Sequence, residues 1–294
     1  MSISALLSKF SRPAEPPKFQ AAHPIRTVAG EWPAIPLPTC KNLENTPEHT
    51  VRFGVDAPVE DVLQAFRRYG IAVIDGGLTK SEIDDANRLL TDLNSESAVI
   101  TFDGGSKVAR IRQHHLAGAI SASNGFRAVA DHRLVKAANT DFYNSTDWNL
   151  IAIYALDYKD FRQDNVAFHI DPTAVPKALV YLSDVESAKD GAFEFDLGSH
   201  REGFFRMTCH YYEANKRAHE IPNDEIRIPT RVLGKAGTII LFNTVGIHRA
   251  GDVANGHIRK SLTYFFSIKD ANDNDLSVPP FEYSVLHQSL ERKY

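Results

Sequence analysis

The sequence is short of the features that mark several large functional classes. Its only cysteines, Cys40 and Cys209, cannot form a disulfide scaffold and do not have zinc-finger spacing. It has no run of eighteen apolar residues, so we expect no membrane-spanning helix, and its N-terminus lacks the long apolar stretch of a signal peptide. This cysteine usage favours a reducing cytoplasm as the location.

A surplus of basic residues is also missing. The formal net charge of -4 gives no bulk attraction toward nucleic acid or acidic membranes. The 294 residues include 43% hydrophobic and 24% charged ones, which is ordinary for a globular protein with a substantial core. We therefore expect a small-molecule partner, no nucleic acid and no membrane, and nothing in the sequence indicates an oligomeric state.

Proline usage predicts where the folded part begins. Residues 1–50 are polar and contain prolines from Pro13 to Pro38, which predicts an extended arm before a single domain over 51–294. The segment 58–69 has helical apolar spacing and ends before Gly70. Thr79 and Glu82 have the spacing of a capping box that opens a helix to about Asn94, and a third helix is predicted around 126–138.

After residue 148 the pattern changes to short apolar segments rich in β-branched and aromatic residues. Such segments predict strands, and many of them in succession predict a barrel or a double-sheet jelly roll. A helix-like insert at about 210–220 interrupts the series. The predicted architecture is thus α+β with a mainly β core, and with N-terminal helices packed on it. The predicted strands are 149–156, 166–170, 177–184, 192–197, 237–243 and 259–268.

The chemistry-bearing residues begin with His169 and Asp171 in FHIDP. Residues two apart on a strand share a face, so this imidazole and carboxylate could approach one metal ion together. His248, 79 residues after His169, is the candidate third ligand, and two histidines with one carboxylate suit non-haem Fe(II) in oxygenases. His-x-Asp also arises by chance, in which case the pair is only hydrogen-bonded, and the His-x-Glu at His200 competes with it.

A candidate carboxylate anchor follows His248. Arg259 lies 11 residues after it, and Ser261 lies two residues further on the same strand face. A guanidinium presents a planar fork that matches a carboxylate, and a serine hydroxyl can donate one more hydrogen bond. The alternative is a solvent-facing arginine, but the flanking Leu262, Tyr264 and Phe266 indicate a buried strand, where an arginine needs an anionic partner.

Three segments carry a family resemblance when they are taken together: FHIDP, ALVYLSDVESAKDGAFEFDLGSH and GKAGTIILFNTVGIHRAGDVANGHIRKS. Over about residues 60–268 the chain resembles the phytanoyl-CoA dioxygenase-like (PhyH) family of Fe(II)/2-oxoglutarate-dependent oxygenases. The resemblance implies a double-stranded β-helix of the jelly-roll or cupin-like type. It also implies iron bound by His169, Asp171 and His248, and 2-oxoglutarate bound by Arg259. The Gly198-Ser199-His200 turn matches a structural loop of the family, which argues against His200 as a ligand.

The same resemblance implies a reaction. Such an enzyme would use O2 to oxidise, most simply to hydroxylate, a small-molecule substrate, with release of succinate and carbon dioxide. Related halogenases have glycine or alanine in place of the ligand carboxylate, so Asp171 favours oxygen chemistry. A metal-dependent hydrolase or isomerase using Zn(II) or Mn(II) is an alternative, and a non-catalytic jelly-roll binding protein is a second one.

Further residues are candidates for ligand contacts. Gln163, shortly before the metal motif, could bind the keto-acid end of 2-oxoglutarate, or it could be a loop amide with no ligand. Arg110 and Arg112 alternate on a predicted strand and could bind an anionic substrate group, although a solvated charged face is the more ordinary role. His114 follows them as a third candidate.

Overall fold

The computed structural model of the chain describes residues 51–94, 100–101, 106–112, 115–159, 167–171, 175–202, 221, 226–227, 229–269 and 275–276. The predicted arm over 1–50 and the predicted insert at 210–220 lie outside these ranges. The single domain over 51–294 therefore stays a prediction.

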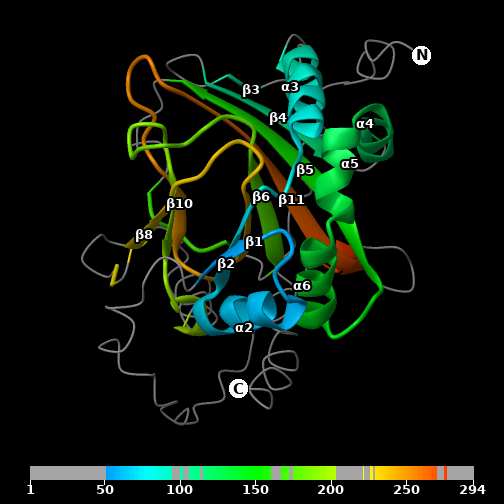
Figure 1. Ribbon diagram of the computed structural model, residues 1–294, viewed down its shortest axis with the longest axis vertical. Helices are drawn as coiled ribbons and strands as arrows, with labels where there is room; N and C mark the ends of the chain where they lie inside the picture. The colour runs from blue at the N-terminus through cyan, green and yellow to red at the C-terminus, as the bar shows by residue number, and fades with distance from the viewer. Residues whose placement is uncertain are drawn as a thin grey trace, which may run out of the picture.

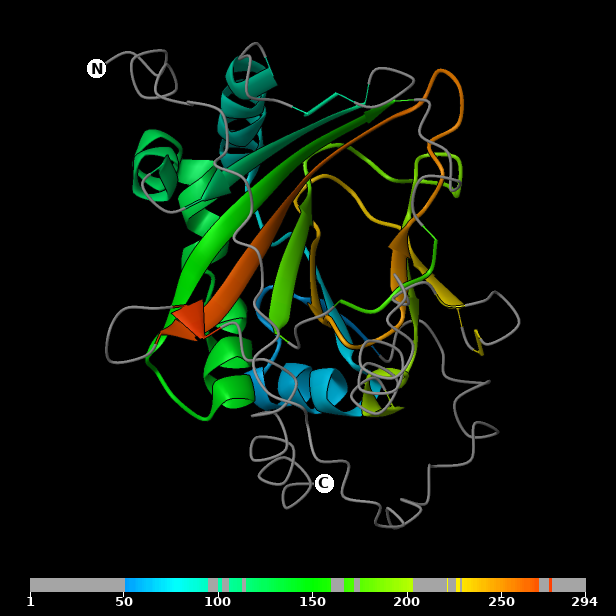
Figure 2. The same ribbon diagram turned by 180° about the vertical axis from the view of Figure 1, so that it is seen from behind.

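Two β-sheets face each other and form a double-stranded β-helix, as predicted (Figures 1 and 2). The major sheet has the order β1-β2-β9-β6-β11-β5-β4-β3, with β12 paired to β11, and the minor sheet has the order β10-β7-β8. The major-sheet strands are β1 (Arg52–Gly54), β2 (Ile71–Asp75), β3 (Ile100–Thr101), β4 (Lys107–Arg112), β5 (Trp148–Lys159), β6 (Pro176–Tyr181), β9 (Ile239–Asn243), β11 (Ile258–Lys269) and β12 (Asp275–Leu276). The minor-sheet strands are β7 (Phe193–Asp196), β8 (Pro229–Val232) and β10 (His248–Ala250).

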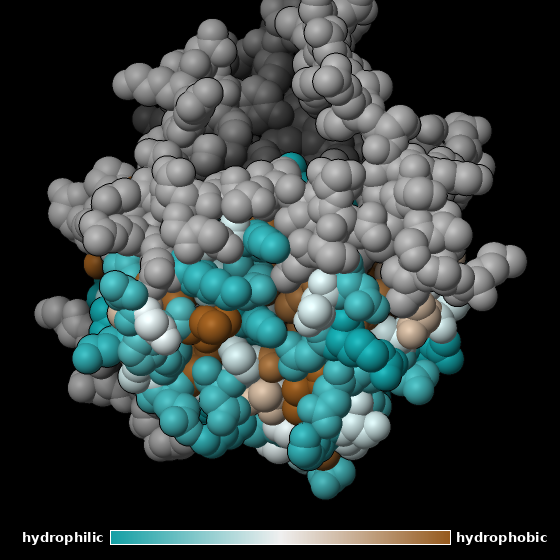
Figure 3. Space-filling model, turned by 90° about the horizontal axis from the view of Figure 1, so that it is seen from above, coloured by the Kyte–Doolittle hydropathy of each residue, from teal (hydrophilic) through white to brown (hydrophobic). Residues whose placement is uncertain are grey.

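Helices cover the outer face of the major sheet, away from the minor sheet (Figure 2). They are α2 (Val59–Tyr69), α3 (Lys80–Asn94), α4 (Leu116–Ala122), α5 (Asn124–Asp131) and α6 (Arg133–Tyr143). None of these helices, within the ranges described, is both long and apolar enough to cross a membrane. On the face seen from above, the described residues are mostly hydrophilic, with hydrophobic ones in small groups (Figure 3).

The predicted helix signals are confirmed at α2 and α3. Gly70 ends α2 in the left-handed conformation and donates its N–H to the carbonyl of Phe66. The capping box forms as predicted, because the backbone N–H of Thr79 donates to Glu82 Oε2 at 2.8 Å and that of Glu82 donates to Thr79 Oγ1 at 3.4 Å.

The predicted helix over 126–138 is instead two helices, and α4 and β8 were missed. The break falls at His132, whose extended backbone separates α5 from α6. Ser123 begins α5 by accepting a hydrogen bond from the N–H of Phe126. The predicted strand over 166–170 is also wrong in extent, because among its described residues, 167–170, only His169 is paired, in an isolated bridge.

Strand β11 shows how the sheet divides the interior. Leu262, Tyr264 and Phe266 face the helices, where the hydroxyl of Tyr264 donates to the carbonyl of Phe126 in α5. The alternating residues Arg259 and Ser261 point to the opposite face, toward the minor sheet. Because side chains alternate between the two faces of a strand, these polar side chains of β11 lie between the two sheets.

Candidate active site

His169, Asp171 and His248 converge as the sequence predicted. Their candidate ligand atoms all lie within 4.8 Å of one another. The backbones of His169 and His248 form an isolated antiparallel bridge between the 167–171 segment and the start of β10. Asp171 is fixed by its N–H, which donates to the carbonyl of Thr244 at 2.9 Å. Three donors from two distant segments therefore surround one point.

Hydrogen bonds to the backbone orient both imidazoles. Nδ1 of His169 lies 2.9 Å from the carbonyl oxygen of Ala167, and Nδ1 of His248 lies 2.8 Å from that of Gly246. A carbonyl can only accept, so both Nδ1 atoms are the protonated ones. Each Nε2 therefore keeps the lone pair that a metal requires.

The charges around the three side chains favour the ligand-competent forms. Burial, with the neighbouring His169, lowers the pKa of His248 to about 3, so this imidazole is neutral at pH 7. Burial alone would raise the pKa of Asp171, but the Lys177 ammonium and the two imidazoles outweigh it and lower that pKa to about 2. Lys177, from β6, forms an ion pair with Asp171 Oδ2.

The turn after β7 supports the backbone that carries His248. Ser199 Oγ is buried, accepts a hydrogen bond from the N–H of Ile247 at 2.8 Å and donates to the carbonyl of Asp196 at 2.6 Å. His200 contacts the carbonyl of Arg67 through Nε2 at 2.9 Å, and it is not a member of the metal-ligand group. The prediction that this turn is structural, and that His200 is not a ligand, agrees with these contacts.

Arg259 and Ser261 form a second polar group, which lies on the inner face of the major sheet. Arg259 is 1% exposed and Ser261 is 0% exposed. The guanidinium donates from Nη1 to the carbonyl of Gly191 and lies 4.8 Å above the ring of Tyr158. Arg259 Nε and Ser261 Oγ have no hydrogen-bond partner within the described part of the chain. Burial lowers the pKa of Arg259, and no carboxylate among the described residues compensates it.

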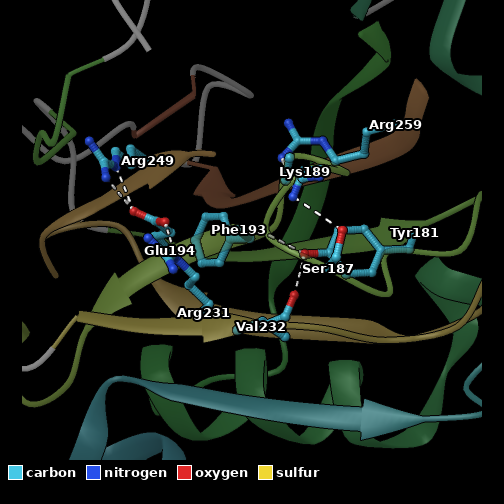
Figure 4. Close-up of polar contacts among 10 residues, drawn as sticks. Tyr181, Ser187, Lys189, Phe193, Glu194, Arg231, Val232, Arg249 and Arg259 are labelled. Carbon is cyan, nitrogen blue, oxygen red and sulfur yellow. Dashed lines mark hydrogen bonds and ion pairs between the residues drawn. The ribbon is translucent and has the colours of Figure 1, made fainter. Parts of the chain in front are cut away.

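The phenol of Tyr181 lies close enough to this guanidinium for an electrostatic interaction, and Figure 4 draws both together with Phe193. The hydroxyl of Tyr181 donates to the carbonyl of Val232 and accepts from the N–H of Phe193. The ring of Phe193 in turn lies 5.9 Å from that of His248. Tyr181 and Phe193 thus connect the surroundings of Arg259 with those of His248.

Comparison with known proteins follows from this geometry. The family model described as phytanoyl-CoA dioxygenase (PhyH) matches residues 66–261, about two thirds of the chain. The chain belongs to the phytanoyl-CoA dioxygenase family. This family makes it an enzyme of the Fe(II)/2-oxoglutarate-dependent oxygenase type, as the sequence predicted. No curated relative matches the chain.

Solved structures similar to this member of the family show the same fold. The α-ketoglutarate-dependent epimerase SnoN from nogalamycin biosynthesis has a TM-score of 0.54 at 19% identity, covering 71% of this chain and 83% of its own. HygX from Streptomyces hygroscopicus, with nickel and 2-oxoglutarate bound, has a TM-score of 0.53 at 21% identity, covering 73% and 88%. The carbocyclase SnoK from nogalamycin biosynthesis has a TM-score of 0.52 at 12% identity, covering 72% and 85%.

The residues of this phytanoyl-CoA dioxygenase-family chain fit the cofactors of its family. Two imidazoles and one carboxylate form the donor set that suits non-haem Fe(II) with open coordination positions. The buried Nε of Arg259 and Oγ of Ser261 are unsatisfied polar atoms, and a buried arginine without an anion is costly. A dicarboxylate co-substrate would supply the missing acceptor.

The other predicted contacts are only partly described. Arg110 lies exposed on β4, with its guanidinium carbon 5.3 Å from the ring centre of Tyr154. The backbone of Arg112 belongs to β4, but its side chain, Gln163 and His114 lie outside the described residues. They stay predictions.

Sequence reasoning missed the charged residues that surround the site. Lys177 was read only as part of a strand, and Glu194 as one residue of the segment 192–197. Glu194, 4% exposed, accepts hydrogen bonds from Arg231 and Arg249 at 2.7 Å each (Figure 4). The available signal was the presence of charged residues in mostly apolar strands, Lys177 in PKALVY and Glu194 with Asp196 in FEFD, because a buried charge requires a partner.

Proposed function

We propose that this protein hydroxylates a small organic substrate with Fe(II) bound by His169, Asp171 and His248. The co-substrate 2-oxoglutarate is bound by Arg259 and Ser261. A single observation carries the proposal: a fully buried guanidinium, without an anionic partner among the described residues, lies between the same two sheets as a His/Asp/His group. Each feature alone has ordinary explanations, but together they match one co-substrate, a keto acid with a distal carboxylate.

The protein residues have separable tasks in this proposal. Arg259 and Ser261 bind the distal carboxylate, and the apolar surroundings strengthen that charge-assisted hydrogen bond by excluding water. His169, Asp171 and His248 hold the metal, and Lys177 fixes the orientation of the Asp171 carboxylate. When bound, the metal with 2-oxoglutarate and O2 supplies the oxidation, with succinate and carbon dioxide as products. The protein contributes position and exclusion of water.

Asp171 also bears on the type of oxidation. Because a carboxylate stands at the position that related halogenases keep free, oxygen transfer is favoured over halogenation. SnoN and SnoK are named as an epimerase and a carbocyclase, so this fold also serves oxidations other than hydroxylation. Their place in nogalamycin biosynthesis supports a substrate from secondary metabolism, and a cytoplasmic location stays our expectation from the cysteine usage.

Anaerobic titration of the purified apo-protein with Fe(II) and then 2-oxoglutarate tests this assignment. The wild type should develop the weak visible absorption band of an Fe(II)–keto acid chelate, and His169→Ala should abolish it. Arg259→Ala should keep the metal but weaken 2-oxoglutarate binding by about 2–5 kcal/mol, the effect of removing one partner of a buried charge pair. Arg127→Ala, an exposed arginine on α5, is the matched control.

Two outcomes would contradict the proposal. A band that persists in His169→Ala would place the metal elsewhere, and 2-oxoglutarate binding that is unchanged in Arg259→Ala would remove the anchor. Binding of Zn(II) without any effect of 2-oxoglutarate would favour the hydrolase or isomerase alternative. Succinate release and mass analysis of products, over a panel of small molecules, then distinguish hydroxylation from other oxidations.

A further inference from the structure

Four side chains lie in a row on the inner face of the major sheet, from the neighbourhood of Asp171 to strand β4. We call Lys177, Phe265, Tyr154 and Arg110 the cation–aromatic strip. Strand register places them in sequence, because Lys177 on β6 is opposite Phe265 on β11 and Tyr154 on β5 is opposite Arg110 on β4. The strip therefore begins at the candidate metal centre and ends three strands away.

Contacts between these side chains are continuous. The Lys177 ammonium lies 4.0 Å from the ring centre of Phe265, whose ring centre is 4.3 Å from that of Tyr154. The guanidinium carbon of Arg110 lies 5.3 Å from the same tyrosine ring. Two aromatic rings are thus held side by side between two cations, within the range of cation–π attraction.

The two cations differ in what they already bind. Lys177 is buried and paired with Asp171. Arg110 is exposed, its guanidinium lies over the ring of Tyr154, and none of the ion pairs in the described part of the chain involves it. An arginine positioned on an aromatic ring keeps its outward N–H groups for an oxyanion. Of the two, Arg110 is the group available to an incoming anion.

We propose that the cation–aromatic strip binds the substrate, and that this substrate is a small organic oxyanion with a flat apolar body. Its body lies on Phe265 and Tyr154, and its anionic group binds Arg110. Three interstrand steps of about 4.8 Å separate β6 from β4, so roughly 14 Å separate the metal end from the anion end. The oxidised carbon is therefore the end of the substrate remote from the anion. This inference rests on the proposed function, because the strip is a substrate site only if the metal centre oxidises.

The most direct test uses biphenyl-4-carboxylate as the probe and the neutral biphenyl-4-carboxamide as its matched partner. Calorimetric titrations are made anaerobically on protein loaded with Fe(II) and saturated with 2-oxoglutarate, which keeps the probe out of the Arg259 pocket. The variants are Arg110→Gln and the control Arg127→Gln, an exposed arginine on the outer helix α5. Benzoate, which carries the same charge on one ring, tests the length of the strip.

In the wild type the carboxylate should bind more tightly than the amide, and benzoate more weakly than either. Arg110→Gln should weaken carboxylate binding about fivefold, as for an exposed ion pair, and leave the amide unchanged. Arg127→Gln should change neither. Equal binding of acid and amide, or no effect of Arg110→Gln on binding of the acid, would overturn the inference.

The visible band of the Fe(II)–keto acid chelate separates the two proposals. If the band forms in the wild type and in Arg110→Gln while the affinity for the probe is the same in both proteins, then only the cation–aromatic strip is refuted as the substrate site. If no band forms in the wild type, then the proposed function fails. Tyr154→Leu provides a second variant, because it removes both the stacking surface and the ring that positions Arg110, and it should weaken binding of both probes, the acid at least as much as the amide.

Discussion

The backbones of His169 and His248 are hydrogen-bonded to each other in both directions, although 79 residues separate them in the sequence. The N–H of His169 donates to the carbonyl of His248 at 3.0 Å, and the N–H of His248 donates back at 2.9 Å. The distance between the two imidazoles is thus fixed by the main chain, with ring centres 4.4 Å apart. Any change that moves either segment should alter metal affinity without touching a ligand.

Ser199→Ala tests this dependence on the supporting turn. The substitution leaves the buried N–H of Ile247, adjacent to His248, without the Ser199 Oγ that it now donates to. We expect a loss of about 1–3 kcal/mol in the free energy of unfolding, measured in urea. Fe(II) affinity, measured by anaerobic titration, should fall at least about tenfold, as when a group that orients a ligand is removed.

Ser145→Ala is the control for that variant. Ser145 Oγ also accepts a backbone hydrogen bond, from the N–H of Asp147 at 3.0 Å, but this bond is exposed and lies outside the segments that carry the site. It should leave Fe(II) affinity unchanged. An unchanged Fe(II) affinity in Ser199→Ala, despite lower stability, would show that the turn stabilises the fold but does not position His248.

A second prediction concerns the unpaired guanidinium. Arg259→Met removes a buried charge whose neighbours, among the described residues, include the Gly191 carbonyl and the Tyr158 ring but no carboxylate. Without 2-oxoglutarate we expect the free energy of unfolding to stay within about 1 kcal/mol of the wild type or to rise, since apolar replacements of buried ions are often stabilising. Added 2-oxoglutarate should stabilise the metal-loaded wild type and not this variant.

Urea unfolding with and without 2-oxoglutarate measures both effects. A loss of more than about 3 kcal/mol in the absence of 2-oxoglutarate would mean that Arg259 is a structural residue with a compensated charge. In that case the pocket would not be built for a missing anion.

Sequence patterns within single helices and strands were enough to predict much of this fold. Residue alternation and β-branched content predicted β5, β6, β7, β9 and β11, and the capping residues predicted the start of α3. The predicted side-by-side placement of Arg259 and Ser261 is confirmed because a strand has a fixed period of two. These features depend on neighbours within a few residues, which a sequence displays directly.

Features that depend on strand register could not be read in the same way. Lys177 faces Phe265 because β6 pairs with β11, and Glu194 faces Arg249 because β7 pairs with β10. A one-residue shift of either pairing would move these charges to the opposite face. The pairing of His248 with His169 is of the same kind: the residues made His248 a candidate third ligand, and the resemblance to a family supported that choice.

Gly70→Ala tests the junction between α2 and the supporting turn. Gly70 has φ of 79°, and an added Cβ would lie 2.5 Å from His200 Nδ1 and 3.0 Å from Phe195 Cζ. Gly256 has a similar φ of 82°, but an added Cβ would meet no atom within 4 Å. Gly256→Ala should therefore destabilise by the left-handed backbone cost alone, about 1 kcal/mol.

Gly70→Ala should destabilise by about 2–3 kcal/mol, because steric contact adds to the backbone cost. Thermal and urea unfolding of the two variants separate the backbone cost from the cost of steric contact. Equal losses in both variants would mean that His200 and Phe195 move aside at no cost, and that α2 is not tightly coupled to the turn.

The last prediction concerns the buried carboxylate of Glu194, which joins Arg231 and Arg249 across the minor sheet. Arg249 directly follows His248, and its guanidinium carbon lies 3.9 Å from the ring centre of Phe168, the residue before His169. Glu194→Gln removes the charge but keeps the shape, so Arg249, whose side chain is 12% exposed, loses its carboxylate. We expect a loss of about 2–3 kcal/mol in unfolding free energy, together with weaker Fe(II) binding.

Arg231→Gln isolates the exposed half of that arrangement. The Arg231 side chain is 59% exposed, so removing it should cost at most about 1 kcal/mol and leave Fe(II) affinity unchanged. The contrast arises because only Arg249 connects the carboxylate to both histidine-bearing segments. If Arg231→Gln were as destabilising as Glu194→Gln, the carboxylate would act through the edge strand β8, and the stacking of Arg249 on Phe168 would not position the histidines.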